Sequence, residues 1–140
     1  MNLVGKAIRQ TIFATSAALV ITAAYAAGSE LQLSGDQEVP PVQTAAKGGG
    51  NITVGADKSV SGSVKTTGVE GTAAHIHEGA AGANGPVIIP LTKGSDGTWS
   101  VPGGAKLTDA QYDSYKAGKL YVNVHSAANK GGEIRAQLKP

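Results

Sequence analysis

Short runs in which apolar and polar residues alternate, separated by glycine-rich turns, recur along the chain from residue 31 onward. Leu31 and Leu33 alternate with polar residues, and so do Ile52 and Val54. A period of two is the pattern of a half-buried β-strand. Further runs of this kind, or short apolar runs, lie at 60–64, 73–77, 87–91, 98–101, 119–126 and 132–138. Together they predict an all-β fold, a Greek-key-like β-sandwich of seven to eight strands.

One segment departs from that period and predicts a short connector helix. Thr108 is followed three residues later by Gln111, which is the form of a capping box. Tyr112 and Tyr115 then lie on one helical face, and Gly118 is suited to the C-cap. We expect this helix to lead directly into the next strand.

Prolines mark where strands are interrupted. Pro40 and Pro41 open a segment up to Gly50 that we expect to be a loop. Pro90 has no amide hydrogen to donate, so the strand 87–91 is expected at a sheet edge or to end there.

The first 26 residues have the composition of a secretory signal peptide. Lys6 and Arg9 form a basic start, an apolar run follows, and Ala24-Tyr25-Ala26 has the A-x-A form of a cleavage site. The alternative is an uncleaved membrane anchor, but this run is shorter than the roughly 20 apolar residues of a span and contains Thr and Ser. We therefore expect residues 1–26 to be removed and residues 27–140 to form one periplasmic or secreted domain.

The charge and composition of that domain exclude several classes of protein. The chain has 12 basic and 10 acidic residues, and two of the basic ones lie in the leader, so 12 − 2 = 10 basic residues match 10 acidic ones. No cluster of Lys and Arg remains to follow phosphates, which disfavours a nucleic-acid partner. Because no second apolar stretch exists, we expect no membrane contact after cleavage. Without cysteine there are no disulfides or iron–sulfur clusters, and without cysteine or a methionine after residue 1 there is no type 1 copper site.

Three histidines form the pattern that carries chemistry. His75 and His77 flank Ile76 in one predicted strand, so alternation places both imidazoles on one face and Ile76 on the other. His125 lies on the polar face of a later strand. If the two strands are neighbours, three neutral imidazoles share one sheet surface, which is the ligand set of a metal site with an open position. The alternative is an ordinary surface strand with polar residues at every second position.

Other polar residues have weaker claims. Glu78 is expected to be a loop carboxylate, although a turn could bring it back to the metal. Glu133, Arg135 and Gln137 share one strand face, which we interpret as a solvated face with an ion pair, with Arg135 orienting an anion near the site as the alternative. The glycine-rich segment 79–86 precedes a strand, not a helix, and is therefore a flexible loop beside His77 rather than a phosphate cradle.

Five separated blocks resemble the CHRD domain, first named from chordin. They cover nearly the whole chain from about Glu30 to Leu138. The blocks are Ser34-Gly35-Asp36-Gln37-Glu38-Val39-Pro40-Pro41, Ala74-His75-Ile76-His77-Glu78-Gly79, Asn84-Gly85-Pro86-Val87, Leu120-Tyr121-Val122-Asn123-Val124-His125 and Gly131-Gly132-Glu133-Ile134-Arg135. The resemblance implies a β-sandwich domain of the kind found in bacterial exported proteins.

A more distant resemblance is to copper–zinc superoxide dismutase, which also has a His-x-His strand pair, a glycine-rich loop after it and a late histidine. It implies that His75, His77 and His125 stand where three copper ligands stand. The chain lacks a fourth histidine and any cysteine, so a bridged two-metal centre and its disulfide have no counterpart. Only a single-metal site carries over, with water, an exogenous molecule or a carboxylate such as Glu78 as fourth ligand.

The sequence thus predicts one metal ion at His75, His77 and His125. Copper is favoured by the affinity order at a nitrogen-only site, with zinc as the alternative. The leading hypothesis is an exported copper-handling protein. A mononuclear copper enzyme acting on superoxide or a similar oxidant is the second. The third is a metal-free module that binds a protein or polysaccharide through a polar strip of Tyr121, Asn123, Arg135 and Gln137.

Overall fold

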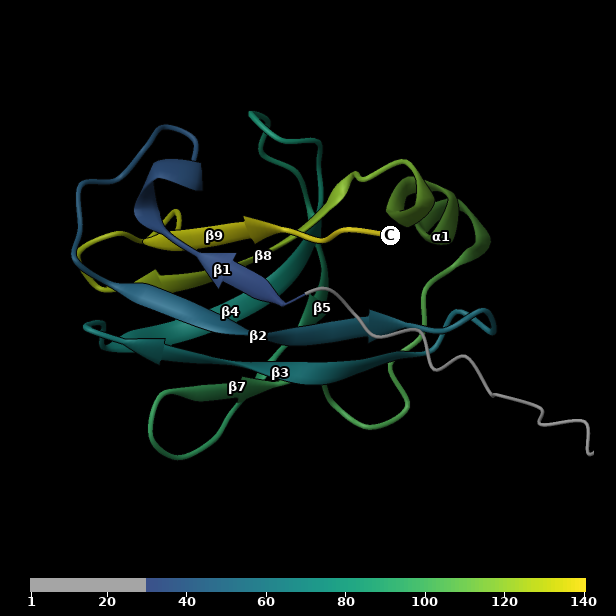
Figure 1. Ribbon diagram of the computed structural model, residues 1–140, viewed down its shortest axis with the longest axis horizontal. Helices are drawn as coiled ribbons and strands as arrows, with labels where there is room; N and C mark the ends of the chain where they lie inside the picture. Colours follow the sequence, from purple (N-terminus) through teal and green to yellow (C-terminus); the bar gives the residue numbers. More distant parts are fainter. Residues whose placement is uncertain (1–29) are drawn as a thin grey trace, which may run out of the picture.

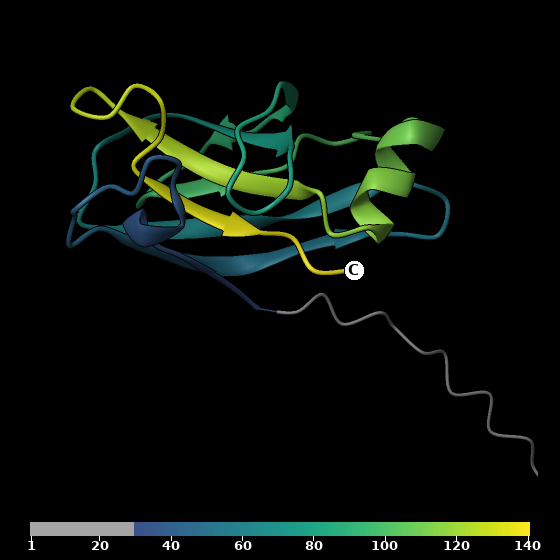
Figure 2. The same ribbon diagram turned by 90° about the horizontal axis from the view of Figure 1, so that it is seen from above.

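The computed structural model describes residues 30–140, which form two antiparallel β-sheets packed against each other (Figure 1). The predicted leader, residues 1–26, lies outside the described residues. One sheet has the strand order β1–β2–β3–β7–β6 and the other has the order β5–β4–β8–β9. Seen from above, β8 and β9 lie in front of β2 and β3 (Figure 2). The predicted all-β sandwich is therefore confirmed.

Nine strands lie within the described residues, one more than the upper number expected from the sequence. The additional strand is the two-residue β6, which is too short to produce a periodic pattern. The strands are β1 (Leu31–Leu33), β2 (Lys47–Val54), β3 (Val60–Thr67), β4 (Gly71–Glu78), β5 (Val87–Pro90), β6 (Thr92–Lys93), β7 (Thr98–Ser100), β8 (Leu120–Ser126) and β9 (Ile134–Gln137). A 3-10 helix, η1 (Gly35–Gln37), follows β1. Pro90 ends β5, an edge strand, as expected from its missing amide hydrogen.

The glycine-rich start of β2 corrects one sequence expectation. We expected residues up to Gly50 to be loop, but β2 begins at Lys47 and pairs with β1 on one side and β3 on the other. Gly50 has φ +153°, and a Cβ atom there would lie 2.2 Å from the carbonyl oxygen of Ser63. The backbones thus approach too closely for a side chain, and glycine here permits a strand instead of breaking one.

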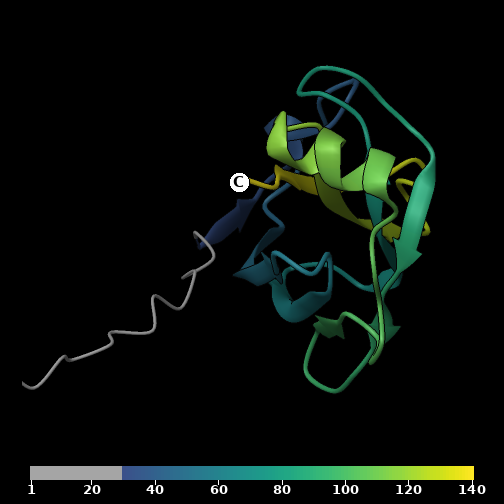
Figure 3. The same ribbon diagram turned by 90° about the vertical axis from the view of Figure 1, so that its right-hand side faces the viewer.

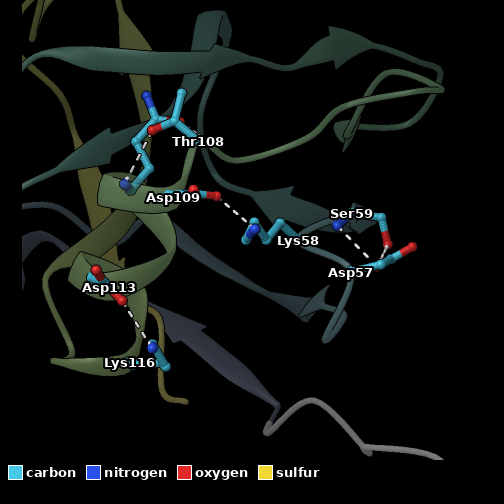
Figure 4. Close-up of polar contacts among 8 residues, drawn as sticks. Asp57, Lys58, Ser59, Thr108, Asp109, Asp113 and Lys116 are labelled. Atoms are coloured by element: carbon cyan, nitrogen blue, oxygen red, sulfur yellow. Dashed lines mark hydrogen bonds and ion pairs between the residues drawn. The ribbon is translucent and has the colours of Figure 1, made fainter.

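The connector helix α1 (Asp109–Lys116) lies at one end of the sandwich, the end that faces the viewer in Figure 3. Its capping box is present: the Gln111 amide donates to the Thr108 hydroxyl, and the Gln111 side chain accepts from the Thr108 amide. An ion pair between Lys58 and Asp109 ties the helix to the β2–β3 turn (Figure 4). Within residues 30–140 no helix is long and apolar enough to cross a membrane.

The apolar core lies between the two sheets and is built from the inward faces of the alternating strands. On β4 and β8 these are Ala74, Ile76, Val122 and Val124, and Trp99 fills the centre from β7. The opposite, polar faces of β4, β8 and β9 therefore point away from the second sheet, and we call this surface the outer face. At one edge the sheets are joined because Ser34 and Arg135 exchange two backbone hydrogen bonds, of 3.2 and 3.0 Å.

Candidate metal centre

The two histidine-bearing strands are hydrogen-bonded neighbours. In the antiparallel register of β4 and β8, Ala73 pairs with His125, His75 with Asn123, and His77 with Tyr121 (Figure 1). His75 and His125 are therefore diagonal neighbours on the outer face, a relation that long or ring-bearing side chains can bridge. The adjacency on which the sequence prediction depended is present, although more than forty residues separate the strands in the chain.

The three imidazoles converge on one point of the outer face. Nδ1 of His75 lies 3.1 Å from Nε2 of His125, and one ring nitrogen from each histidine lies within 4.8 Å of the other two. The ring centres are 4.9 Å apart for His75 and His125, 5.5 Å for His75 and His77, and 6.0 Å for His77 and His125. No imidazole points elsewhere.

Backbone carbonyls fix the tautomers of two of the rings. Nδ1 of His77 donates to the carbonyl of Gly85 at 2.9 Å, and Nδ1 of His125 donates to the carbonyl of Lys130 at 2.8 Å. Each ring therefore carries its hydrogen on Nδ1 and leaves Nε2 unprotonated, as metal-binding histidines commonly do. Nε2 of His125 accepts a hydrogen bond of 3.1 Å from Nδ1 of His75. Nε2 of His77 is buried and has no hydrogen-bond partner. An unpartnered buried nitrogen of this kind is costly unless something binds it.

The environment of His75 and His77 favours their neutral forms. Burial lowers the pKa of His75, and the nearby rings of His125 and His77 lower it further. Burial also lowers the pKa of His77, against the opposing effect of its hydrogen bond to Gly85. Because a metal ion binds only the unprotonated nitrogen, these shifts remove proton competition near neutral pH.

The geometry fits one ion after a small adjustment. Metal–imidazole bonds of about 2.0–2.1 Å allow two ligand nitrogens to lie no more than about 4.2 Å apart. The His75–His125 pair already meets this limit at 3.1 Å, and the widest separation, within 4.8 Å, exceeds it by at most about 0.6 Å. Rotation of the imidazoles about their side-chain bonds supplies a movement of that size.

The polar strip on β8 and β9 is buried, which corrects a second expectation. Arg135 is 1% exposed and Glu133 is 8% exposed, so this strand face is not solvated, and the two residues form no ion pair. Burial alone would raise the pKa of Glu133, but hydrogen bonds from Ser126, Thr44 and Asn129 lower it overall. Tyr121 is buried as well, and Gln137 is half-buried.

Two loops cover the strip. The Arg135 guanidinium donates to the carbonyl of Ala80, and the Gln137 amide donates to the carbonyl of Gly79, so the loop 79–86 is held across β8 and β9 (Figure 2). The Asn84 amide in turn donates to the Val39 carbonyl in the segment after η1. The loop 79–86, expected to be flexible, is thus anchored by two side chains of β9.

Glu38, which the sequence analysis did not single out, lies next to the centre. It is 4% exposed, and its Oε1 and the Oδ1 of Asn123 are buried without a hydrogen-bond partner. Burial raises the pKa of Glu38 to about 7, while Asn123 and the charge of Arg135 act in the opposite direction. The Asn123 side chain also acts on His77. Asn123 thus affects the pKa of both Glu38 and His77. No periodic signal marked it, because it lies in a loop.

Glu78 is the last residue of β4, not a loop residue, and it pairs with Leu120. It is not among the residues whose ligand atoms gather with those of the three histidines.

Comparison with known proteins agrees with the fold and the blocks of sequence described above. The family model of the CHRD domain matches residues 30–138, from the start of the described chain to the residue after its last strand. No curated protein and no solved structure matches the chain, so the resemblance to superoxide dismutase stays a prediction. The match spans most of the 140 residues, and the chain belongs to the CHRD domain family.

Proposed function

We propose that this CHRD protein binds one copper ion through His75, His77 and His125 and serves in copper handling. One observation carries the proposal: three ring nitrogens from two paired strands lie within 4.8 Å of one another. In addition, the hydrogens of His77 and His125 are turned outward to carbonyls, so that their lone pairs face the shared point. This is an arrangement of neutral nitrogen ligands with at least one open position.

Copper is the first choice of ion for chemical reasons. Imidazole suits both copper and zinc, and at a nitrogen-only site the affinity order of divalent ions favours copper. Zinc remains the alternative. The leader-like residues 1–26, with Lys6, Arg9 and the Ala24-Tyr25-Ala26 signal, support a place of action in the periplasm or outside the cell.

The test is a Cu(II) titration of purified protein, followed by calorimetry, with each histidine replaced in turn. We expect one ion per chain in the wild type and a large loss of affinity in His75→Ala, His77→Ala and His125→Ala. Thr92→Ala, an exposed change on the opposite sheet, is the matched control and should bind as the wild type does. Identical weak binding by wild type and His125→Ala would refute the proposal, and competition with Zn(II) decides between the two metals.

The affinity should also depend on pH in a defined direction. Protons compete for the same lone pairs, so binding should weaken as the pH drops below about 6.5, the ordinary pKa of histidine. The lowered pKa values of His75 and His77 place the loss below, not above, that value. A pH-independent affinity between 5 and 8 would show that the imidazoles are not the ligands.

A second candidate function is a mononuclear copper enzyme acting on superoxide or a similar small oxidant. It is favoured by the partial exposure of His75 and His125, which leaves the solvent side of the centre accessible to a small molecule. Copper-dependent turnover that disappears in His125→Ala would establish the enzyme. Stoichiometric binding without turnover would leave a copper carrier.

A further inference from the structure

Three stacked planar side chains end at one histidine of the metal centre. Cζ of Arg135 lies 3.4 Å from the centre of the Tyr121 ring. That ring is parallel to the His77 imidazole, with 4.7 Å between centres and 3° between planes. All three side chains are buried. The guanidinium charge is therefore shielded from water. Its Cζ atom lies at most 8.1 Å from the centre of the His77 imidazole, which is the sum of the two distances.

This charge has no carboxylate partner within the described residues. The guanidinium donates to three neutral oxygens: the Ala80 carbonyl at 3.0 Å, Oε1 of Gln137 at 3.3 Å and Oδ1 of Asn84 at 3.4 Å. Glu38 is the carboxyl group whose ionisation responds to Arg135, and burial raises its pKa to about 7, so it offsets the charge only in part at neutral pH. A buried cation with so little compensation repels any further positive charge nearby.

We infer that Arg135 biases the three-histidine centre toward the ion of lower charge, Cu(I), over Cu(II) and Zn(II). The inference rests on the proposed function, because it concerns the same site. The three ligands are neutral imidazoles, so the full charge of the ion is felt by the guanidinium. Cu(I) carries one positive charge and Cu(II) carries two. The electrostatic repulsion between Arg135 and the ion is therefore weaker for Cu(I).

The size of the bias follows from Coulomb's law. For a separation on the order of 10 Å and an effective dielectric constant of about 20, one unit of charge changes the ratio of the Cu(I) and Cu(II) affinities by about tenfold. For a one-electron couple, a tenfold change corresponds to about 59 mV. The Tyr121 ring excludes water from the path between the two groups, which keeps screening low.

A structural role for Arg135 would leave a different signature. Its bonds to Ala80 and Asn84 hold the loop 79–86, which supplies the carbonyl that orients His77. Loss of that support would weaken the binding of Cu(I) and of Cu(II) by the same factor, and it would lower the unfolding temperature. Only the electrostatic role changes the ratio of the two affinities.

The experiment measures both affinities by competition with a Cu(I)-selective and a Cu(II)-selective chelator, on wild type and Arg135 variants. Arg135→Met removes the charge and keeps an unbranched apolar chain, and Arg135→Gln keeps an amide donor for the Ala80 carbonyl in case the Met variant does not fold. Arg135→Lys keeps the charge. We expect the Cu(I) preference to fall about tenfold in the Met and Gln variants and to be largely retained in the Lys variant.

A fourth variant tests the sign of the effect. Glu38→Gln removes a negative charge from the same neighbourhood, so at pH 8.5 it should shift the ratio the other way, toward Cu(I). An unchanged ratio in a folded Arg135→Met or Arg135→Gln protein that still binds one copper ion would overturn the inference and leave the proposed function standing. Absence of copper binding in the wild type would overturn the proposed function itself.

Discussion

The buried carboxyl group of Glu38 makes the stability of this fold depend on pH in a way that one substitution should remove. In the folded chain its pKa is raised from 4.5 to about 7 by burial, so the folded state holds this proton more tightly than the unfolded state does. Protonation of Glu38 therefore contributes to the free energy of unfolding. This contribution is greatest below pH 4.5 and is lost as the pH rises through 7. Glu38→Gln imitates the protonated form at every pH.

The magnitude follows from the shift. About 2.5 pKa units, at 1.36 kcal/mol each, correspond to an upper value of about 3 kcal/mol by which the charged form is disfavoured above pH 7. We expect Glu38→Gln to be more stable than wild type by as much as about 3 kcal/mol at pH 8.5 and nearly equal to it at pH 4.5. Protonation of His75 and His77 at low pH acts on both proteins alike and cancels in the difference.

Urea denaturation followed by tryptophan fluorescence, at pH 4.5, 7 and 8.5, measures this difference. With an m-value of about 1–3 kcal/mol per molar urea, the midpoints at pH 8.5 should differ by about 1 M or more. Glu70→Gln, which removes an exposed carboxylate, controls for the change in net charge. A stability difference between Glu38→Gln and wild type that is the same at all three pH values would refute the reasoning. It would show that ionisation of Glu38 does not destabilise the folded state.

Three further substitutions separate the roles of the loop, the core and the helix cap. Gly85→Ala places a Cβ 1.6 Å from the Glu78 carbonyl oxygen, so the loop must move and release His77. The copper affinity of this variant should fall by about 10- to 100-fold in a metal titration. The control is Gly103→Ala, where a Cβ meets nothing within 4 Å, and its copper affinity should equal that of the wild type. Ile76→Val should cost about 1 kcal/mol in urea denaturation but leave copper affinity as it is, because Ile76 faces the core; a loss of copper affinity would contradict the two-face assignment of β4. Thr108→Ala removes the capping box of α1 and should also cost about 1 kcal/mol, and an unchanged urea midpoint would show that the cap is not needed.

The alternation of residues along β4 and β8 was enough to predict which face carries the histidines. Ile76 and Val122 are directly paired in the core, and the residues on either side of each must point the other way. The pairing of the two strands was not predictable from that pattern. It depends on the sheet order, in which β5 pairs with one side of β4, β6 and β7 belong to the other sheet, and β8 pairs with the remaining side of β4.

Burial of the outer face was not predictable either, and the reason is physical. A period of two distinguishes the core face from the opposite face, but it does not show whether that opposite face meets water or a loop. Tyr121, Asn123 and Arg135 have the side chains of a solvated strand face and are nevertheless 2% exposed or less. Their donor groups form hydrogen bonds to loop carbonyls, such as that from Arg135 to Ala80, and those partners follow no sequence period.

Glycine connects these two results. In the sequence, the glycines of residues 79–86 indicate only a turn, yet a Cβ at Gly85 would collide with Glu78. The missing side chain lets Gly85 approach both His77 and Tyr121: its carbonyl accepts from the imidazole and its amide donates to the phenol oxygen. One residue thus fixes the tautomer of a candidate ligand and positions the ring stacked on it. Glycine indicates a loop in the sequence because it has no side chain. For the same reason, Gly85 can approach His77 and Tyr121 closely enough to form hydrogen bonds with both.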